Sequence, residues 1–189
     1  PSNSRAHNNL GVFFGGQGEE EKALDHFRAA VDADPNNSMA RLALSKLLWR
    51  QRQCQAAIPH FEQFLATSPG HVDARMQQAI CHAQLGEYAE ARQLIEAGHE
   101  AFPQQPRLQD AMIRLLAASP DASVRDGERA LEMAQRLTAV VRRPETLESL
   151  AMAYAELSRF AEAIENQQEV IRAAEQQGLE SRLDYLRSN

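Results

Sequence analysis

A period of 34 residues runs through this chain. Pro35, Pro69 and Pro103 lie on that period. The same spacing relates Leu10 to Leu44, Ala23 to Ala57 and Ala91, and Phe27 to Phe61 and Ile95. A repeat of this length indicates stacked units, each too small to bury its apolar face alone. We therefore expect the leucines and phenylalanines of this set to be buried between neighbouring units.

The composition indicates that these units are helical. Only 6% of the 189 residues are aromatic, and there are 9 glycines and 8 prolines. Good helix formers such as Ala, Leu, Glu, Gln and Arg are abundant. Few runs alternate Val, Ile, Thr or Tyr with polar residues, which is the pattern of strands. The sequence therefore predicts an all-α fold.

The clearest copy of the repeat is NNLGVFFGGQGEEEKALDHFRAAVDADPNN. Its landmark residues are Leu10, Gly11, Phe14, Gly18, Ala23, Phe27, Ala30 and Pro35. This pattern resembles the tetratricopeptide repeat (TPR), whose unit is two antiparallel helices with a small residue early in the second helix and a proline at its end. The resemblance implies an α-α superhelix, a right-handed solenoid of antiparallel helix pairs.

The resemblance covers nearly the whole chain, so we expect residues 1–189 to form a single TPR-like solenoid. The expected parts are repeat 1 at 4–37, repeat 2 at 38–71, repeat 3 at 72–105, a divergent repeat 4 at 106–143, repeat 5 at 144–176 and a C-terminal capping helix at 178–188. The capping helix is predicted from the helical spacing of Leu179, Leu183 and Leu186. Pro1 falls at the end of a unit in the same frame, which predicts a fragment of a larger, bacterial TPR-containing protein.

The fourth unit departs from the period. Its extra residues fall in ASPDASVRD, residues 118–126. Pro120 cannot lie inside a helix, and Asp126 can cap the helix that follows. We expect a longer surface loop here, and a loop that contacts a partner is the alternative.

The glycine cluster in FFGGQGEEEKAL could suggest a phosphate-binding loop. Such a loop needs Lys and Ser or Thr after its last glycine, but Gly18 is followed by Glu19, Glu20 and Glu21, which repel phosphate. The register instead places the cluster at the corner between the two helices of repeat 1. We expect Gly18 to supply the left-handed backbone that ends the first helix.

The resemblance also implies where a partner would bind, because the first helices of TPR units line a concave groove. The expected peptide-binding groove comprises Asn8, Asn9, Val12, Met39, Leu42, Lys46, Trp49, Arg50, Met76, Gln77, Ile80 and Arg114. An apolar, methionine-rich patch with one aromatic residue and nearby cations suits an extended peptide or an amphipathic helix. The alternative is that Trp49 and its neighbours pack internally.

Two specific devices of the family are not matched here. The clamp for a C-terminal carboxylate requires Lys, Asn and Arg at positions that carry Asn8, Val12, Ala43, Asp73 and Gln77. The asparagine ladder of sugar-transferase members keeps only its first rung, Asn9. The resemblance therefore predicts a groove without predicting its ligand.

Other classes of function are disfavoured. The net charge of −6 and the lack of a basic cluster argue against nucleic acid. Cys54 and Cys81 lack metal or redox spacing, so we expect buried apolar fillers. No catalytic triad, metalloprotease motif or membrane-length apolar run is present, so we expect no catalytic residues, cofactor, metal or direct membrane insertion of this segment. The compartment is left open between cytoplasm and periplasm.

These observations predict a non-catalytic module that binds a peptide or helix of a protein partner in its groove. The alternative is a regulatory, spacer or self-association array, forming a homo-oligomer or attached to an enzyme such as a glycosyltransferase or to a membrane-embedded protein. Scaffold alone does not decide between them.

Overall fold

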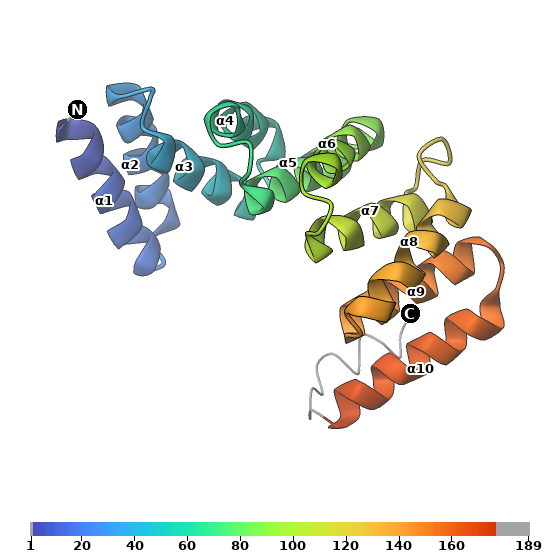
Figure 1. The fold of residues 1–189 in the computed structure, drawn as a ribbon. Helices are drawn as coiled ribbons and strands as arrows, with labels where there is room; N and C mark the ends of the chain where they lie inside the picture. Colours follow the sequence, from blue (N-terminus) through green and yellow to red (C-terminus); the bar gives the residue numbers. More distant parts are fainter. Residues whose placement is uncertain (1, 177–189) are drawn as a thin grey trace. The chain divides into compact units, whose positions relative to one another are not determined.

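The computed structural model describes residues 2–176, and every regular element in that range is an α-helix (Figure 1). The helices are α1 (Ser2–Gly16), α2 (Glu20–Ala33), α3 (Ser38–Arg50), α4 (Cys54–Thr67), α5 (Val72–Gln84), α6 (Tyr88–Ala101), α7 (Pro106–Ala118), α8 (Gly127–Val140), α9 (Pro144–Glu156) and α10 (Phe160–Gln176). The prediction of an all-α superhelix of helix pairs is confirmed. The capping helix predicted at 178–188 lies outside the described residues.

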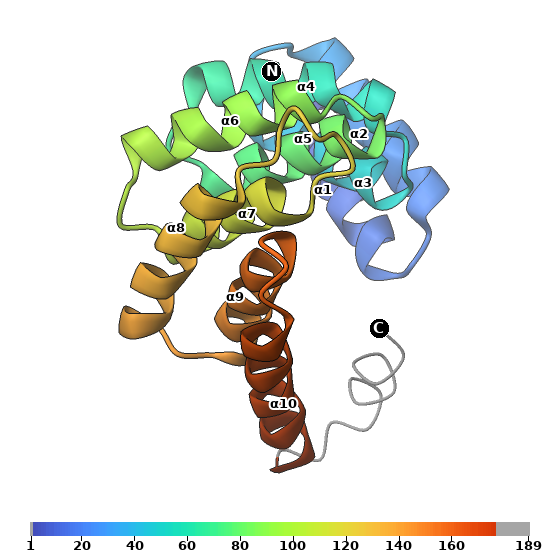
Figure 2. The same cartoon turned by 90° about the vertical axis from the view of Figure 1, so that its right-hand side faces the viewer.

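The chain divides into two compact structural units, each of which contains more than one helix pair. Unit 1 runs to Ala101 and contains α1 to α6, whereas unit 2 starts at Phe102 and contains α7 to α10. In unit 1 each helix packs on the next, and α3 also contacts α1 and α5. In unit 2, α7 packs on both α8 and α9, and α10 packs along α9, as both views show (Figures 1 and 2).

The core of unit 1 is built by the periodic apolar positions. Leu44 and Phe61 are fully buried, and Phe27 is buried in the same cluster. The alanines at 23, 57 and 91 are also buried, which allows the paired helices to approach closely. These positions were predicted to be buried between neighbouring repeats, and the prediction is confirmed for the six residues named here.

Leu10 is the exception, because 42% of its surface is exposed. The prediction of a buried Leu10 was wrong. Leu44, one period later, is covered because helices lie on both sides of α3. Among the described helices, α1 contacts α2 and α3, which leaves part of Leu10 uncovered.

Four of the five corners between paired helices in residues 2–176 share one backbone conformation, and the α7–α8 connection is the exception. Gly18, Arg52, Gly86 and Ser158 have positive φ angles of 78°, 59°, 81° and 59°. At each of these four corners the next residue donates its N–H to a carbonyl five residues back, at 2.9 Å, as in Glu19 N to Phe14 O. This is the bonding pattern of the Schellman motif, in which a left-handed residue ends the helix. The predicted role of Gly18 is confirmed.

We expect Arg52→Gly to raise the free energy of unfolding of the protein by about 0.5–1 kcal/mol. A side chain in the left-handed region is strained, whereas glycine adopts that conformation freely. Urea denaturation followed by circular dichroism measures the change. Gln53→Gly, one residue further along the same corner, is the control and should stabilise nothing, since no positive φ occurs there. Equal or lower stability of Arg52→Gly would contradict this account of the corner.

The connection between α7 and α8 is the long one of unit 2 and is held by its own polar groups. The N–H of Asp126 donates to Leu116 O at 2.9 Å, and the Asp126 carboxylate accepts from Arg129 N at 3.1 Å, capping α8 as predicted. Hydrogen bonds from Ser123 lower the pKa of the Asp121 carboxyl. Val124 is buried beneath the loop. These contacts give the loop a defined conformation.

Candidate peptide-binding surface

The candidate site is the surface of unit 1 formed by α1, α3 and α5, which we call the first-helix face. Because α3 contacts both α1 and α5, the three helices form one continuous surface. All of the predicted groove residues except Arg114 belong to these helices. Arg114 belongs to α7, in unit 2.

The apolar residues of the first-helix face differ in exposure. Val12, Met39 and Ile80 are 60%, 67% and 39% exposed, and Met76 is half-buried. Leu42 and Trp49 are half-buried and pack against the core cluster of unit 1. The alternative of internal packing therefore applies to Leu42 and Trp49, while Val12, Met39 and Ile80 remain accessible.

Two amide side chains on this face have buried oxygens that bond to nothing. Asn8 Oδ1 and Gln77 Oε1 are shielded from solvent, yet neither has a hydrogen-bond partner within the described part of the chain. Asn9, beside Asn8, is exposed. Leaving a buried carbonyl oxygen unsatisfied is unfavourable, so these atoms are places where a donor from another molecule would be stabilising.

The two predicted groove cations of α3, Lys46 and Arg50, are in different electrostatic situations. The Arg50 guanidinium pairs with Glu20 Oε1 at 2.6 Å. Lys46, one turn earlier, is half-buried and makes no hydrogen bond or ion pair with any residue between 2 and 176. Lys46 is therefore a positive charge without a counter-charge in the described part of the chain.

A pocket of about 210 Å³ opens between α1, α2 and α3. Its lining includes Val12 and Gly15 of α1, Phe27 of α2, and Lys46 and Arg50 of α3. Three of the predicted groove residues, Val12, Lys46 and Arg50, are thus brought together around one hollow. Sequence reasoning assigned Gly15 to the corner and missed the space that its lack of a side chain leaves.

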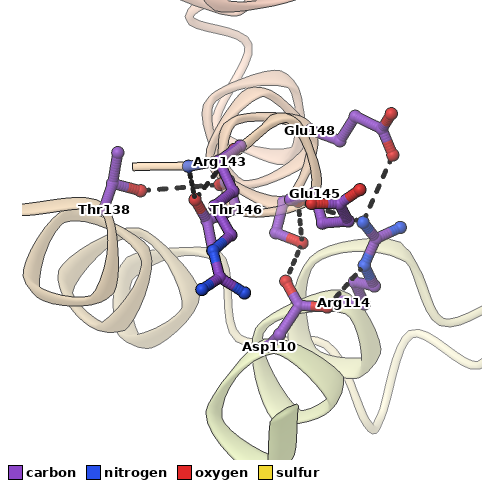
Figure 3. A network of polar contacts seen from close by, with 8 residues as sticks. Asp110, Arg114, Thr138, Arg143, Glu145, Thr146 and Glu148 are labelled. Carbon is purple, nitrogen blue, oxygen red and sulfur yellow. Dashed lines mark hydrogen bonds and ion pairs between the residues drawn. The ribbon is translucent and has the colours of Figure 1, made fainter. Parts of the chain in front are cut away.

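Arg114 is held in a polar network inside unit 2 (Figure 3). Its guanidinium pairs with Asp110 at 3.0 Å and Glu148 at 3.3 Å, and it donates to Glu145 O at 3.1 Å. The buried hydroxyl of Ser149 donates to Asp110 Oδ1 at 2.5 Å. These contacts tie α7 to α9, so Arg114 has a structural role in addition to any contact with a partner.

The cysteine side chains and His60 are packed among other residues of unit 1. Cys54 and Cys81 are free and buried, which confirms their prediction as apolar fillers. Burial raises the pKa of the Cys81 thiol, and a hydrogen bond with Cys54 adds to the effect. Burial also lowers the pKa of the His60 imidazole, and the charge of Arg41 adds to that effect.

Residues 2–176 contain neither a candidate metal centre nor a helix that could span a membrane. No group of three or more His, Cys, Asp and Glu side chains in that range could hold a metal ion. His7 and His26 bring their Nδ1 atoms to 3.0 Å from each other, and His82 Nδ1 lies 2.7 Å from Glu87 Oε2. No helix of the described part has the length and apolar character needed to cross a membrane.

The paired helices, shared corners and periodic seams define a helical-repeat protein. Models of the tetratricopeptide repeat match residues 1–38, 42–106 and 145–176. The chain therefore belongs to the tetratricopeptide repeat family. Proteins of this family are protein-interaction modules and are typically non-catalytic.

The individual proteins that resemble this chain share a third or less of its residues over the matched range. The chain is 29% identical over 165 residues to cellulose synthase operon protein C of Pseudomonas fluorescens (strain SBW25), covering 82% of this chain and 13% of that protein. It is 33% identical over 82 residues to the peroxisomal targeting signal receptor of Kluyveromyces lactis, covering 43% of this chain and 14% of the receptor. The chain thus spans about an eighth to a seventh of these relatives. The solved structure of MamA from Desulfovibrio magneticus RS-1 matches with a TM-score of 0.79 at 16% identity, covering 94% and 98% of the two chains, and shares the fold.

Proposed function

We propose that this chain is a non-catalytic interaction module that holds a peptide segment or helix of a partner protein on its first-helix face. The observation that carries the proposal is the combination of accessible apolar side chains with buried amide oxygens that lack donors. Apolar contacts supply affinity in such sites, and a few polar groups fix the orientation of the ligand. The family assignment supports a protein or peptide as the partner.

The extended shape of the site favours a segment over a globular surface. The exposed apolar residues are spread over three parallel stacked helices instead of one compact patch: Val12 on α1, Met39 on α3 and Ile80 on α5. A ligand that contacts all of them must cross from helix to helix. A single chain segment does this with alternate side chains facing the protein. One of the similar proteins is itself named a receptor for a targeting signal.

The proposal predicts that random 12-residue peptides displayed on phage will yield sequences that bind the purified chain. We expect Met76→Glu to lower the affinity of a selected peptide by about tenfold or more, because a buried charge would face the apolar ligand. The matched control is Gln63→Glu on α4, an exposed position outside the first-helix face. Fluorescence polarisation measures each affinity. Failure to enrich any sequence, or equal loss in both variants, would refute the proposal.

A second candidate is a spacer or self-association array within a longer protein. It is favoured by the match to 13% of cellulose synthase operon protein C, a much longer chain. Light scattering coupled to size-exclusion chromatography separates the two candidates. A stable oligomer that persists in Met76→Glu, together with no peptide binding, would support the array.

A further inference from the structure

The pocket between α1, α2 and α3 is open because residue 15 is a glycine. A Cβ built on Gly15 would lie 3.7 Å from the Cβ of Ala23, an ordinary contact, and Gly15 has no positive φ. Neither packing nor backbone conformation therefore requires a glycine there. Gly11 is different, since its Cβ would lie 2.6 Å from two ring atoms of Phe27. Gly11 is needed for the approach of α1 to α2, whereas Gly15 leaves space.

The space suits one apolar side chain of moderate size. Its volume is about 210 Å³, and an apolar cavity of about 150 Å³ is enough to bind benzene. The walls from Val12, Phe27 and Leu47 are apolar. A leucine, methionine or phenylalanine side chain of a ligand would contact Phe27 and Leu47, which are already buried, and would cover Val12, which is 60% exposed.

The edge of the pocket favours a negative charge beside that side chain. The guanidinium of Arg50 is already neutralised by Glu20 at 2.6 Å. Lys46 also lines the pocket and has no partner among residues 2–176. An ammonium group next to an apolar pocket attracts a carboxylate more strongly than one in open solvent, because the local dielectric constant is lower.

An acceptor without a donor lies on α1 outside the lining of the pocket. Asn8 precedes Val12 by four residues, so the two lie on one face of α1. Asn8 Oδ1 is buried and has no donor in the described part of the chain. A backbone N–H of a bound segment would satisfy it once the Asn8 side chain turns outward.

We propose that this pocket binds an apolar side chain of a partner segment that carries an aspartate or glutamate within two residues of it, with the carboxylate paired to Lys46. The inference rests on the proposed function and names the chemistry of its ligand. The cation here belongs to α3 and pairs with a side chain, so a free C-terminus is not required. The partner is therefore a protein segment with an acidic residue within two residues of an apolar one.

The test uses a peptide selected from the random 12-residue library, labelled with fluorescein. We expect the enriched sequences to contain Leu, Met, Ile or Phe within two residues of Asp or Glu. Gly15→Leu should fill the pocket and weaken binding by more than about tenfold, whereas Gly16→Ala, whose Cβ meets nothing within 4 Å, should leave the affinity unchanged. Thermal unfolding of both variants checks that they are folded.

Lys46→Gln keeps the test informative if Gly15→Leu does not fold. It should weaken binding by about tenfold and reduce the dependence of affinity on salt. Changing the acidic residue of the peptide to its amide should give the same loss, and the two changes together should cost no more than either alone.

Two outcomes overturn the inference in distinguishable ways. If selected peptides lack the acidic residue, or bind Gly15→Leu and Lys46→Gln normally while Met76→Glu abolishes binding, the inference is wrong and the proposed function stands. If no peptide is enriched on the wild-type chain, both are wrong. Charge reversal gives a supporting result: Lys46→Glu should select peptides with Lys or Arg in place of the acid.

Discussion

Replacing Phe61 by alanine is expected to lower the free energy of unfolding by about 3–5 kcal/mol, because a buried aromatic side chain is lost and a cavity remains. Phe61 is fully buried and belongs to the core cluster that joins α2, α3, α4 and α5. Well-packed neighbours on several helices can collapse only partly into the space. Urea denaturation monitored by circular dichroism measures the loss.

The control for Phe61→Ala is Phe160→Ala. Phe160 is the same residue type at the start of α10, but 60% of its surface is exposed. Its replacement should change the free energy of unfolding by no more than about 0.5 kcal/mol. Similar losses in the two variants would mean that Phe61 is not part of a packed seam.

Asp110→Ala is expected to cost about 2–3 kcal/mol in the free energy of unfolding. Asp110 is the centre of the network in Figure 3, where it accepts from the buried Ser149 hydroxyl and pairs with Arg114. Hydrogen bonds to charged groups contribute more than neutral ones, and removing the carboxylate leaves Arg114 without one of its two acidic partners. Asp110→Asn should lose less, since an amide oxygen still accepts from Ser149.

An equivalent pair on the surface of the same unit provides the control. Glu132 and Arg136 have the same spacing on α8 and lie 2.5 Å apart, but both side chains are mostly exposed. Exposed ion pairs contribute little, so Glu132→Ala should cost no more than about 0.5 kcal/mol. If Asp110→Ala were equally harmless, the network would not hold α7 to α9.

Much of the fold could be predicted because one backbone geometry recurs at one register position. Gly18 and Gly86 signal a left-handed corner by their residue type, but Arg52 and Ser158 do not. The period places Arg52 at the position of Gly18 and Gly86, and Ser158 holds the same position in the register of the last repeat, beyond the longer fourth repeat. At this position the geometry of the paired helices forces a side-chain-bearing residue into the left-handed region. Register therefore carries information that local propensity lacks.

The candidate site was predictable in outline but not in detail. The period indicates which residues lie on the first helices, yet exposure depends on the size of the neighbours, so Trp49 packs on the core while Met39 remains in solvent. Ion pairing depends on residues far apart in sequence: Glu20 neutralises Arg50, and Glu148 holds Arg114. The pocket at Gly15 exists because glycine has no side chain, and no sequence motif predicts such a pocket.

The two buried thiols can be used to measure local opening of the structure. Cys54 and Cys81 are buried on α4 and α5, and burial raises the pKa of the Cys81 thiol, which disfavours the thiolate that alkylating reagents require. Reagents such as iodoacetamide therefore modify them only when this part of the structure opens. Under native conditions the modification rate gives the free energy of that local opening. A cysteine engineered onto the surface would therefore react with a fluorescent label far faster than Cys54 and Cys81.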